Sequence, residues 1–575
     1  MITLGLNAAF HDSAACLVRD GVTVAAAEEE RFSRIKHAKR PVPFSAWELP
    51  YAAIDYCLRE AGVTLADVDH VAYAYDPELF PGKPAPGADI VLPQRPSLDR
   101  RTSGTHENPW DPLFYAYLVN APLQLNAGAP HHLKKRYTSP RYRWHYVGHH
   151  LAHEASAFLA APWDRCAVMT LDGRGEQATT TFGVWRGGEY RRLKEIHAPH
   201  SLGLLYEDVT RHLGFLHSSD EYKVMALASY AEPAYLDDFR DIVRVDDEGG
   251  YRIVGPDLAL RFGAPRVPGA PFEDHHARIA ASLQKVLEET ALKLATWLQR
   301  VTGERHLAMA GGVALNCVMN ARIRDSGLFD ALWVQPAAGD AGTALGAALW
   351  IDREQRRGGA TEPMRHAYLG PAFDDEEIEQ LLRWSRLPYR RMANVAEETA
   401  ALLAEDRVIG WFQGRMEFGP RALGARSILA SPISTTMQGR LNELKDREDF
   451  RPVAPAILEE RLYEWFESKH RAERAPFMLF VYDTKPERRA RIPAAVHVDG
   501  TARVQTVRRD DNAPYYDLLQ AFERRTGVPI LINTSFNSRG LPIVCTPRDA
   551  IEAFYSTPLD ALAIGSFLLD KRGIR

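Results

Sequence analysis

The sequence predicts an α/β protein of at least two domains, the first of which is internally duplicated. The chain of 575 residues is too long for a single hydrophobic core. A strand–turn–strand–turn–strand pattern at 2–26 recurs at 167–193, and segments with helical spacing follow both copies. A polar, glycine-punctuated stretch at 353–366 divides the chain. We therefore expect one domain at 1–352, a linker at 353–366 and a second domain at 367–575.

The two repeated units have the same order of strands and turns. In the first, strands are expected at 2–7, 14–18 and 22–26, and Asp20-Gly21 makes the second turn. The second unit has its strands at 167–171, 179–184 and 190–193. A duplication of this kind predicts an α/β domain with a nucleotide cleft between its halves.

The overall composition excludes several classes of protein. Hydrophobic residues make up 46% and charged residues 25%, as in ordinary soluble proteins. Lys and Arg number 70 against 75 Asp and Glu, and the net charge of -5 does not indicate a nucleic-acid partner. The five cysteines show no Cys-x-x-Cys spacing, which argues against a zinc ribbon or a disulfide scaffold. We expect a cytoplasmic protein without a membrane partner, and homo-oligomers remain possible.

A segment between the two units, at 76–143, is rich in Pro and Gly but contains an apolar and aromatic run around Trp110. Such a segment is either an insertion that covers the cleft as a lid or a passive surface excursion. As a lid, it would help to choose the substrate.

Two histidines and an aspartate form the first candidate metal site. His149 and His153 lie four residues apart on a predicted helix, so both imidazoles are on one face. Asp172 ends the apolar strand at 167–171, just before a glycine turn, where a carboxylate points into a cleft. A His-x-x-x-His pair is also common as a polar surface or a core contact, and the Asp-Gly-x-Gly-Glu turn shifts the balance toward a metal site.

Two glycine turns of the first domain are candidates for ligand contact. The helix predicted at 283–298 stops at Gly303, and the following strand breaks at Gly311 and Gly312. Glycines allow the backbone to approach a ligand, although tight packing also explains a Gly-Gly pair. Asp340, in the second turn, is either a fourth metal ligand, a ligand to a nucleotide-bound metal, or a helix cap.

The second domain contains four basic clusters in loops. A strand at 408–412 leads into the loop 413–427, which has three arginines and three glycines. Guanidinium forks match phosphate oxygens, and glycines let the backbone come close to them. The other clusters lie at 445–452, around Arg503 and Arg508, and in the polar turn that ends the strand near 531–540. Each cluster alone could pair with nearby acids, but the four together predict an anion site.

Six motifs together resemble the NodU/CmcH family of O-carbamoyltransferases. They occur in matching order over nearly the whole chain, at 10–15 (FHDSAA), 28–32 (EEERF), 149–153 (HHLAH), 310–316 (AGGVALN), 419–424 (GPRALG) and 533–537 (NTSFN). The resemblance implies a first domain of the actin/Hsp70/sugar-kinase type, a duplicated ribonuclease-H-like fold similar to TsaD proteins. It also implies a YrdC-like α/β fold for the second domain.

The same resemblance implies a reaction in two steps. The YrdC-like domain would make carbamoyl adenylate from carbamoyl phosphate and ATP, releasing pyrophosphate. The TsaD-like domain would then pass the carbamoyl group to a hydroxyl of a natural product, such as an antibiotic, a sugar or a polyketide alcohol. Carbamoyl adenylate would hydrolyse in water, so an enclosed route between the domains is expected.

The resemblance also assigns roles to individual residues. His11 would lie beside the reacting carbonyl, as a general base for the acceptor hydroxyl or as a polariser of the carbonyl. The ligands of an iron(II) ion, with zinc or manganese as alternatives, would be His149, His153, Asp172 and Asp340. Nucleotide contacts would be Gly311, Gly312, Asn316 and Lys223. The phosphates of carbamoyl phosphate and ATP, with magnesium as a possible companion, would be bound by Arg421, Lys445, Arg451, Arg503, Ser535 and Asn537.

Three other functions remain open on the sequence alone. Threonylcarbamoyl transfer to tRNA is disfavoured by the net charge of -5. A small-molecule kinase of the same superfold would convert ATP to ADP rather than to AMP. A non-catalytic iron-binding or regulatory protein would lose its metal in a His149→Ala variant without any loss of turnover.

Overall fold

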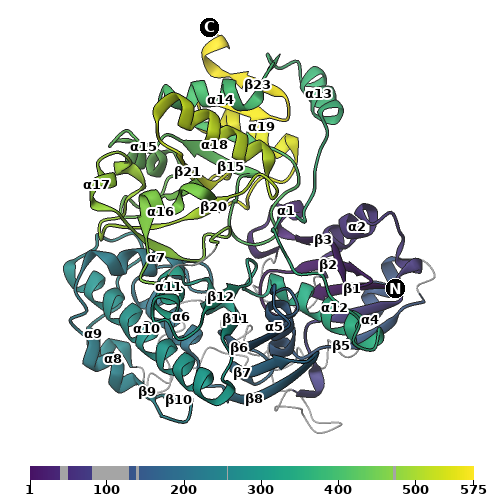
Figure 1. Ribbon diagram of the computed structural model, residues 1–575, viewed down its shortest axis with the longest axis vertical. Coiled ribbons are helices and arrows are strands. Elements are labelled where there is room, and N and C mark those ends of the chain that lie inside the picture. The colour runs from purple at the N-terminus through teal and green to yellow at the C-terminus, as the bar shows by residue number, and fades with distance from the viewer. Residues whose placement is uncertain (39–48, 80–128, 138–140, 256, 471–473, 575) are drawn as a thin grey trace.

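The computed structural model describes residues 1–38, 49–79, 129–137, 141–255, 257–470 and 474–574 (Figure 1). Most of the segment predicted as a lid, including the run around Trp110, lies outside the described residues. Within the part of the chain that the structure describes, no helix combines the length and hydropathy needed to cross a bilayer.

The first half of the N-terminal region contains a five-stranded sheet and several helices. Its strands are β1 (Ile2–Asn7), β2 (Ala14–Arg19), β3 (Val22–Glu28), β4 (His70–Tyr73) and β5 (Arg143–Tyr146), and its helices are α1 (Glu30–Ser33), α2 (Tyr51–Glu60), α4 (Ala129–Arg136) and α5 (His149–Phe158). The turn between β2 and β3 has positive φ at both Asp20 and Gly21, as a tight two-residue hairpin requires.

The second half contains another five-stranded sheet and a larger set of helices. Its strands are β6 (Arg165–Leu171), β7 (Ala178–Arg186), β8 (Glu189–His197), β11 (His306–Ala310) and β12 (Ala331–Val334). The hairpin β9 (Val243–Val245) and β10 (Tyr251–Ile253) lies to one side, and the helices are α6 (Leu202–His212), α7 (Glu221–Leu227), α8 (Leu236–Ile242), α9 (Leu258–Phe262), α10 (Asp274–Thr302), α11 (Cys317–Asp325) and α12 (Ala341–Gln355). Helix α10 ends at Gly303 in a left-handed conformation, as predicted.

The two sheets have the same topology. Their strand orders are β3-β2-β1-β4-β5 and β8-β7-β6-β11-β12. In each sheet the first three strands are antiparallel, and the last two run parallel to the first. Each sheet is followed by a helix, α5 in the first half and α12 in the second. The predicted repetition of the three-strand units is therefore confirmed, and it extends to the two parallel strands that follow.

Helices α5 and α12 pack against each other between the two sheets (Figure 1). Helix α12 lies on β1, β2 and β4, and α5 lies on β6 and β11. Glycines make the close approach possible, because a Cβ at Gly5 would lie 1.9 Å from the Ala344 carbonyl oxygen, and one at Gly346 would lie 1.8 Å from that of Ala152. The packing brings the N-termini of the two helices to the same place.

The C-terminal region is a mixed eight-stranded sheet covered by helices. The sheet has the order β13-β23-β22-β14-β15-β21-β16-β20. Its strands are β13 (Arg390–Arg391), β14 (Ile409–Phe412), β15 (Arg426–Ala430), β16 (Ala454–Leu458), β20 (Gln505–Val507), β21 (Ile530–Ser535), β22 (Ala561–Ile564) and β23 (Phe567–Asp570), and a small second sheet contains β17 (Phe466–Glu467), β18 (Val481–Thr484) and β19 (Thr501–Arg503). The helices are α13 (Asp375–Trp384), α14 (Val395–Ala404), α15 (Met437–Leu444), α16 (Leu462–Trp465), α17 (Pro486–Arg489), α18 (Ala513–Thr526) and α19 (Pro547–Ser556).

The predicted α/β class holds for all three large sheets. A YrdC-like assignment of the C-terminal region stays a prediction, as do the limits of the two domains. Helix α12 continues to Gln355, three residues into the stretch predicted as the linker.

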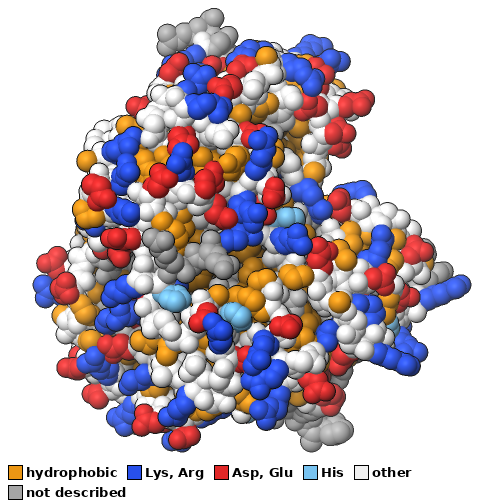
Figure 2. Space-filling view, in the orientation of Figure 1, with side chains coloured by type: hydrophobic (Ala, Val, Ile, Leu, Met, Phe, Trp, Pro, Cys, Tyr) orange, Lys and Arg blue, Asp and Glu red, His pale blue; other side chains and the backbone are white. Residues whose placement is uncertain are grey.

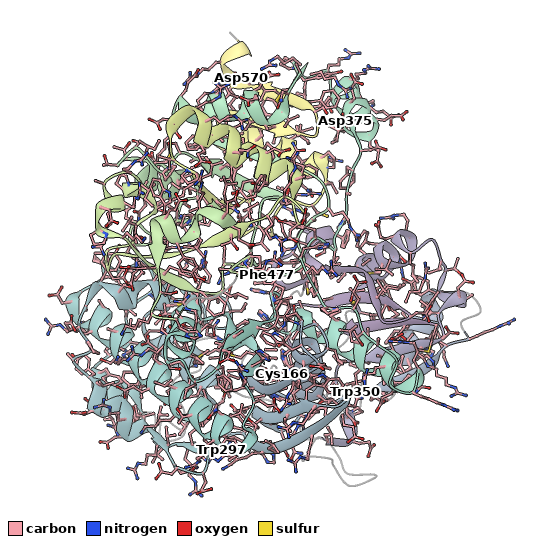
Figure 3. The ribbon with its side chains drawn as sticks, in the orientation of Figure 1. Cys166, Trp297, Trp350, Asp375, Phe477 and Asp570 are labelled. Carbon is pink, nitrogen blue, oxygen red and sulfur yellow. The ribbon has the colours of Figure 1, made fainter. Side chains whose placement is uncertain are left out.

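Specific side-chain contacts join the C-terminal region to the N-terminal region. Phe477, labelled in Figure 3 where the two regions meet, packs edge-on against Trp333 of β12 with ring centroids 5.5 Å apart. Arg31 of α1 donates to the Gly419 carbonyl oxygen at 2.9 Å, and the Gly419 amide donates to Glu28 at 2.8 Å. Hydrogen bonds thus connect the region at 28–34 to the loop 413–427 of the C-terminal region.

Candidate functional site

Four buried side chains place one donor atom each around a common point. The Nε2 atoms of His149 and His153 are 3.2 Å apart. Asp172 Oδ2 lies 3.5 Å from the first nitrogen and 3.8 Å from the second. Asp340 Oδ1 lies 3.6 Å from both. All four donor atoms fall within 4.8 Å of one another, so the structure brings together the complete metal-ligand set predicted from the sequence.

The duplicated fold explains why these four residues meet. His149 begins α5 and Asp340 is the N-cap residue of α12, the equivalent helix of the other half. Asp172 follows β6, the first strand of the second sheet. Asp340 occupies a capping position, but its side chain makes no capping hydrogen bond and turns to the histidines instead. Asp340 is therefore a helix cap by position, and its side chain contacts the metal-ligand set.

Neighbouring groups hold two of the candidate ligands in place. The Gly312 amide donates to Asp172 Oδ1 at 2.7 Å, which leaves Oδ2 for the histidines. Glu176 Oε1 accepts from the His149 amide at 2.8 Å, at the positive end of α5. Burial raises the pKa of Glu176, and the nearby His149 partly offsets that effect. These contacts fix the start of α5 relative to the end of β6.

The donor set fits a metal ion better than it fits a hydrogen-bond network. Separations of 3.2 to 3.8 Å match neighbouring ligands that are each bonded to one ion at about 2.0–2.2 Å. Burial alone would lower the pKa of His149, but Asp340 and Asp172 outweigh it and raise that pKa to about 9. Two imidazoles and two carboxylates suit iron(II), zinc or manganese. The donor set alone does not select among these metals.

His11 lies directly beside this cluster. Its backbone amide donates to Asp340 Oδ2 at 3.0 Å, so the carboxylate connects the metal-ligand set to the loop after β1. Its Nδ1 lies 2.9 Å from Asp12 Oδ2. Burial would lower the pKa of His11, but Asp12 outweighs it and raises the pKa to about 9. The predicted catalytic residue and the predicted metal ligands thus occupy one site.

The four predicted nucleotide residues differ in what they contact. Gly311 has φ +93°, and a Cβ there would lie 2.2 Å from the Leu171 carbonyl oxygen, so the glycine allows β6 and β11 to approach at the site. Asn316 uses its side chain as the N-cap of α11, accepting from the Met319 amide at 2.9 Å. Lys223 is held by carboxylates, with its Nζ 3.0 Å from Glu448 and 3.1 Å from Asp220. Of the four, Gly312 has the most direct contact with the metal-ligand set.

A cluster of cations lies in the C-terminal region, at the boundary with α7 and α11. Burial and then Arg503 lower the pKa of Arg421, and burial and then Arg451 lower that of Arg447. The Nε of Arg421, the Nη2 of Arg447 and the Nε of Arg503 are buried without a hydrogen-bond partner among the described residues. Guanidinium groups stay charged, so buried donors that repel one another are poised for an anion.

Three of the other predicted phosphate-binding residues form a single group beside the arginines. Lys445 Nζ lies 2.5 Å from the Ser535 carbonyl oxygen, 3.1 Å from Ser535 Oγ and 2.7 Å from Asn537 Oδ1. Burial, followed by Arg447 and Arg451, holds the pKa of Lys445 well below its usual value. The structure therefore gathers all six predicted phosphate-binding residues around one region.

Two arginines of the loop 413–427 do not belong to that anion site. Arg426 is fully buried, stacks on Phe412 at 3.7 Å from the ring centre, and donates to the Pro371 carbonyl oxygen at 2.8 Å. Arg415 donates to the Leu369 carbonyl oxygen at 2.8 Å. Glu417 accepts from the backbone amides of Leu423, Ala425 and Arg426. The carboxylate of Glu417 is thus bound by the backbone of its own loop. Arg421 is the arginine of this loop that belongs to the cation cluster.

Cys317 lies where the two sites meet. It is the first residue of α11, directly after Asn316, and its thiol contacts Arg503. Burial raises the pKa of the thiol, whereas Arg503 and Arg421 act in the opposite direction. The glycine turn beside the metal-ligand set and the cation cluster are therefore joined through the short segment at 311–317.

Three residues of the site were not assigned from the sequence. The ring of Tyr222 on α7 lies under Arg451, 4.7 Å from its guanidinium carbon. The sequence placed Arg447 in the basic cluster at 445–452 but gave it no individual role. His37 lies 2.7 Å from Asp12, which pairs with His11. The sequence signal for Tyr222 was its place directly before Lys223, and no spacing rule connects it to an arginine so far along the chain.

Comparison with known proteins identifies the family. The Carbamoyltransferase N-terminus family matches residues 2–349, and the Carbamoyltransferase C-terminus family matches residues 400–571. This chain belongs to the carbamoyltransferase family. Nodulation protein NolNO of Sinorhizobium fredii is 41% identical, covering 98% of this chain and 80% of its own. The resemblance predicted from the six motifs is confirmed, and the protein is a carbamoyltransferase enzyme.

Other carbamoyltransferase relatives cover the chain to different extents. An uncharacterized protein of Synechocystis is 39% identical over 99% of this chain and 96% of its own. Nodulation protein U of Rhizobium tropici is 39% identical over 46% of this chain and 44% of its own. Among solved structures, HypF of T. kodakarensis aligns with 62% of this chain and 48% of its own, at a TM-score of 0.32 and 13% identity.

Proposed function

We propose that this carbamoyltransferase uses ATP and carries out two linked reactions. At the cation cluster, carbamoyl phosphate loses its phosphate to water. An oxygen of the resulting carbamate then bonds to the α-phosphorus of ATP, the bond from that phosphorus to the β-phosphate oxygen breaks, and carbamoyl adenylate forms with release of pyrophosphate. At the His11 site, the carbamoyl group passes from the adenylate to a hydroxyl of a small molecule, such as an alcohol of a natural product or a sugar. The observation that carries the proposal is the adjacency of the two sites through the segment 311–317.

The cation cluster supports the first reaction. Carbamoyl phosphate and the ATP phosphates are polyanions, and a surplus of buried guanidinium groups is unfavourable until an anion neutralises it. Arg421, Arg447 and Arg503 form no ion pair with a carboxylate among the described residues, and each leaves a buried N–H without a partner. Phosphate oxygens would satisfy these donors, and the Lys445 group lies beside them.

The four-residue cluster supports the second reaction. His149, His153, Asp172 and Asp340 would hold iron(II), zinc or manganese. A bound ion would supply a Lewis-acidic positive charge for the phosphate of the adenylate. The residues themselves order the site, because the Gly312 amide orients Asp172 and the His11 amide orients Asp340.

The transfer step exchanges one bond to the carbamoyl carbon for another. The acceptor oxygen forms a C–O bond to that carbon, the bond from the carbon to the phosphate oxygen breaks, and AMP leaves with the electron pair. The acceptor proton is lost to a base. His11 either takes this proton or donates to the carbonyl oxygen, and both roles require its ring to be fixed beside the carbonyl.

The face of the molecule drawn in Figure 2 gives no support to a tRNA acceptor. On the face shown in Figure 2, Lys and Arg side chains alternate with Asp and Glu rather than forming a continuous basic area. An RNA-binding surface gains most of its affinity from clustered cations. We therefore propose a small acceptor, and a gel-shift assay with bulk tRNA tests the choice.

The deciding experiment measures the first reaction without any acceptor. Purified protein is incubated with iron(II), ATP and carbamoyl phosphate, and pyrophosphate and adenine nucleotides are quantified. We expect pyrophosphate release that depends on carbamoyl phosphate and falls at least about 100-fold in Arg421→Ala. Arg525→Ala is the matched control, because its half-exposed guanidinium pairs with Glu397 on the outer surface.

Two results would reject the proposal. Formation of ADP instead of pyrophosphate would indicate a kinase. Pyrophosphate release at the same rate with and without carbamoyl phosphate would mean that the cation cluster activates some other acid. Equal losses in Arg421→Ala and Arg525→Ala would show that the Arg421 effect reflects stability rather than substrate binding.

A further inference from the structure

We infer that His37 is a positioning residue for carbamoyl transfer: it holds Asp12, and through Asp12 the imidazole of His11, in the orientation that transfer requires. The inference rests on the proposed function, because that function places His11 beside the reacting carbonyl. His37 acts through Asp12 and takes no part in bond making or breaking.

The carboxylate of Asp12 is shared between two imidazoles. His11 Nδ1 lies 2.9 Å from Asp12 Oδ2, and His37 Nδ1 lies 2.7 Å from Asp12 Oδ1. The two rings are close neighbours, with centroids 4.0 Å apart. Each oxygen of the carboxylate therefore has its own ring nitrogen, so a change at His37 alters the partner that His11 depends on.

The chain of hydrogen bonds has a single consistent direction. The ammonium group of Lys36 can only donate, and its Nζ lies 2.8 Å from Ser219 Oγ. Ser219 Oγ, which accepts from Lys36, keeps its own proton available for His37 Nε2, 3.1 Å away. With Nε2 as the acceptor, the proton of His37 is on Nδ1 and points at Asp12. The same logic places a proton on Nδ1 of His11, so Nε2 is the nitrogen turned away from Asp12.

The protonation of His37 agrees with this direction. Burial and then the neighbouring His11 lower the pKa of His37. A neutral imidazole accepts on one nitrogen and donates from the other, whereas an imidazolium could only donate. The role assigned to His37 needs both functions.

The backbone at both partners is held in an unusual conformation. Asp12 has φ 46° and His37 has φ 61°, in the left-handed region. That region is unfavourable for a residue that carries a Cβ atom. Specific bonds hold it: Asn7 Nδ2 donates to the carbonyl oxygens of His11 and Asp12 at 2.7 and 3.0 Å, and the His37 amide donates to Glu30 at 2.8 Å. Strain that is held by dedicated contacts is typical of functional sites.

The contact lengths argue against a second metal site formed by the same residues. His11, Asp12 and His37 could in principle offer three ligand atoms. The two nitrogen–oxygen distances of 2.9 and 2.7 Å are those of ordinary hydrogen bonds, with one imidazole for each oxygen. In the four-residue cluster, by contrast, two Nε2 atoms face each other at 3.2 Å. We therefore expect one metal ion per chain.

The test separates formation of the adenylate from its consumption. The metal-loaded enzyme is mixed with ATP and [14C]carbamoyl phosphate, with glycerol as the probe alcohol and water as the second acceptor present in every sample. Rapid quenching gives the rate of pyrophosphate release and the rate at which bound carbamoyl adenylate decays to AMP. The variants are His37→Ala, His37→Asn, Asp12→Asn and the double variant His37→Ala/Asp12→Asn.

We expect decay of the adenylate to slow by roughly 10- to 100-fold in His37→Ala, with pyrophosphate release unchanged. His37→Asn retains an N–H for Asp12 and tolerates the left-handed backbone, so it should stay within about threefold of the parent. Asp12→Asn should slow decay as much as His37→Ala or more. Because His37 acts through Asp12, carbamoyl adenylate should decay no more slowly in the double variant than in Asp12→Asn alone.

His70→Gln is the matched control. His70 is likewise paired with a second imidazole, at 3.0 Å from His145, in the same sheet. It pairs with Thr3 at the start of β1, whereas His11 follows the end of that strand. In His70→Gln, the rate of pyrophosphate release and the rate of adenylate decay should both match those of the parent enzyme.

Three outcomes would overturn the inference while leaving the proposed function intact. These are a parallel loss of both rates in His37→Ala, multiplicative effects in the double variant, and two metal ions per chain in the parent with one lost in His37→Ala. Absence of pyrophosphate release from the parent enzyme is a different result, because it rejects the proposed function and the inference together.

Discussion

The backbone amide of His11 donates a hydrogen bond to Asp340 Oδ2 at 3.0 Å, while Oδ1 of the same carboxylate lies 3.6 Å from both facing histidine nitrogens. One carboxylate therefore joins the loop after β1 to the metal-ligand set. The two residues come from opposite halves of the duplicated fold, so the site exists only when the halves are packed through α5 and α12.

The first prediction concerns this shared carboxylate. Asp340→Asn removes one negative donor and weakens the acceptor for the His11 amide, so we expect metal affinity to fall by about 10- to 100-fold. Chelator competition measures the affinity, and elemental analysis gives the stoichiometry. Asp352→Asn is the control, because Asp352 is a buried aspartate on the same helix that pairs with Arg356 at 2.7 Å. Equal losses in both variants would contradict a ligand role.

The second prediction concerns the pH dependence of metal binding. In the metal-free protein the carboxylates raise the pKa of His149 to about 9. A metal ion must displace that proton, so apparent affinity should rise about tenfold per pH unit up to roughly pH 9 and then level off. Competition titrations between pH 6.5 and 10 check this. An affinity that does not change below pH 9 would mean that His149 is not a ligand.

The raised pKa of His149 also predicts how the stability of the metal-free protein depends on pH. A raised pKa means that the charged histidine stabilises the fold, fully below its ordinary value of 6.5 and progressively less as pH rises toward about 9. Urea unfolding of the chelator-treated protein should therefore show stability falling over that interval, and bound metal should remove the dependence.

The third prediction tests the close approach of β6 and β11. A Cβ at Gly311 would lie 2.2 Å from the Leu171 carbonyl oxygen, and φ there is +93°. Gly311→Ala should lower the free energy of unfolding by about 2–4 kcal/mol and weaken metal binding, because Leu171 precedes Asp172. Gly327→Ala is the matched control: φ is +69°, but no atom lies within 4 Å, so only the backbone cost of about 1 kcal/mol applies. Equal effects would rule out the steric explanation.

The fold and the metal-ligand set were largely predictable because their signals are local. Alternating strands with Asp20-Gly21 at a turn, and two histidines four residues apart, need only neighbouring sequence. Asp172 and Asp340 were recognisable from strand ends before glycine turns. The structure adds the reason that they converge, which is the packing of Gly346 against Ala152, a contact between distant segments.

Other features depended on long-range contacts and could not be predicted from spacing. The arginines of the loop 413–427 looked alike in sequence, yet Arg426 is buried on Phe412 and Arg415 reaches the Leu369 carbonyl oxygen. Nothing in the local sequence separates them from Arg421. Tyr222 is similar, since its contact with Arg451 forms only when α7 meets the C-terminal region.

The fourth prediction follows from that contact. Tyr222→Ala removes the aromatic face beneath the guanidinium of Arg451, so the affinity for pyrophosphate should fall by about 5- to 30-fold. Tyr222→Phe keeps the ring and should retain most of the affinity. Calorimetric titration with pyrophosphate measures both variants. A loss of equal size in both would show that the phenol hydroxyl, not the stacking, is the group that contributes.

The fifth prediction uses the lysine beside the arginines. Burial and the cations Arg447 and Arg451 hold the pKa of Lys445 well below its usual value of 10.5, so its amine loses its proton more readily in the empty site than a solvated lysine does. A bound dianion offsets the repulsion and raises that pKa, so anion binding should draw a proton from solvent. Sulfate is a suitable probe because it does not itself titrate in this range.

Calorimetry of sulfate binding at pH 9, in buffers of different ionisation enthalpy, measures this uptake. We expect net proton uptake in the parent and none in Lys445→Met. Lys571→Met is the control, because Lys571 also has a lowered pKa but donates to the Phe554 carbonyl oxygen, away from the cluster. Binding heats that are the same in every buffer would mean that Lys445 keeps its proton in the empty site. The charge that receives the phosphates would then come from a permanently protonated cluster.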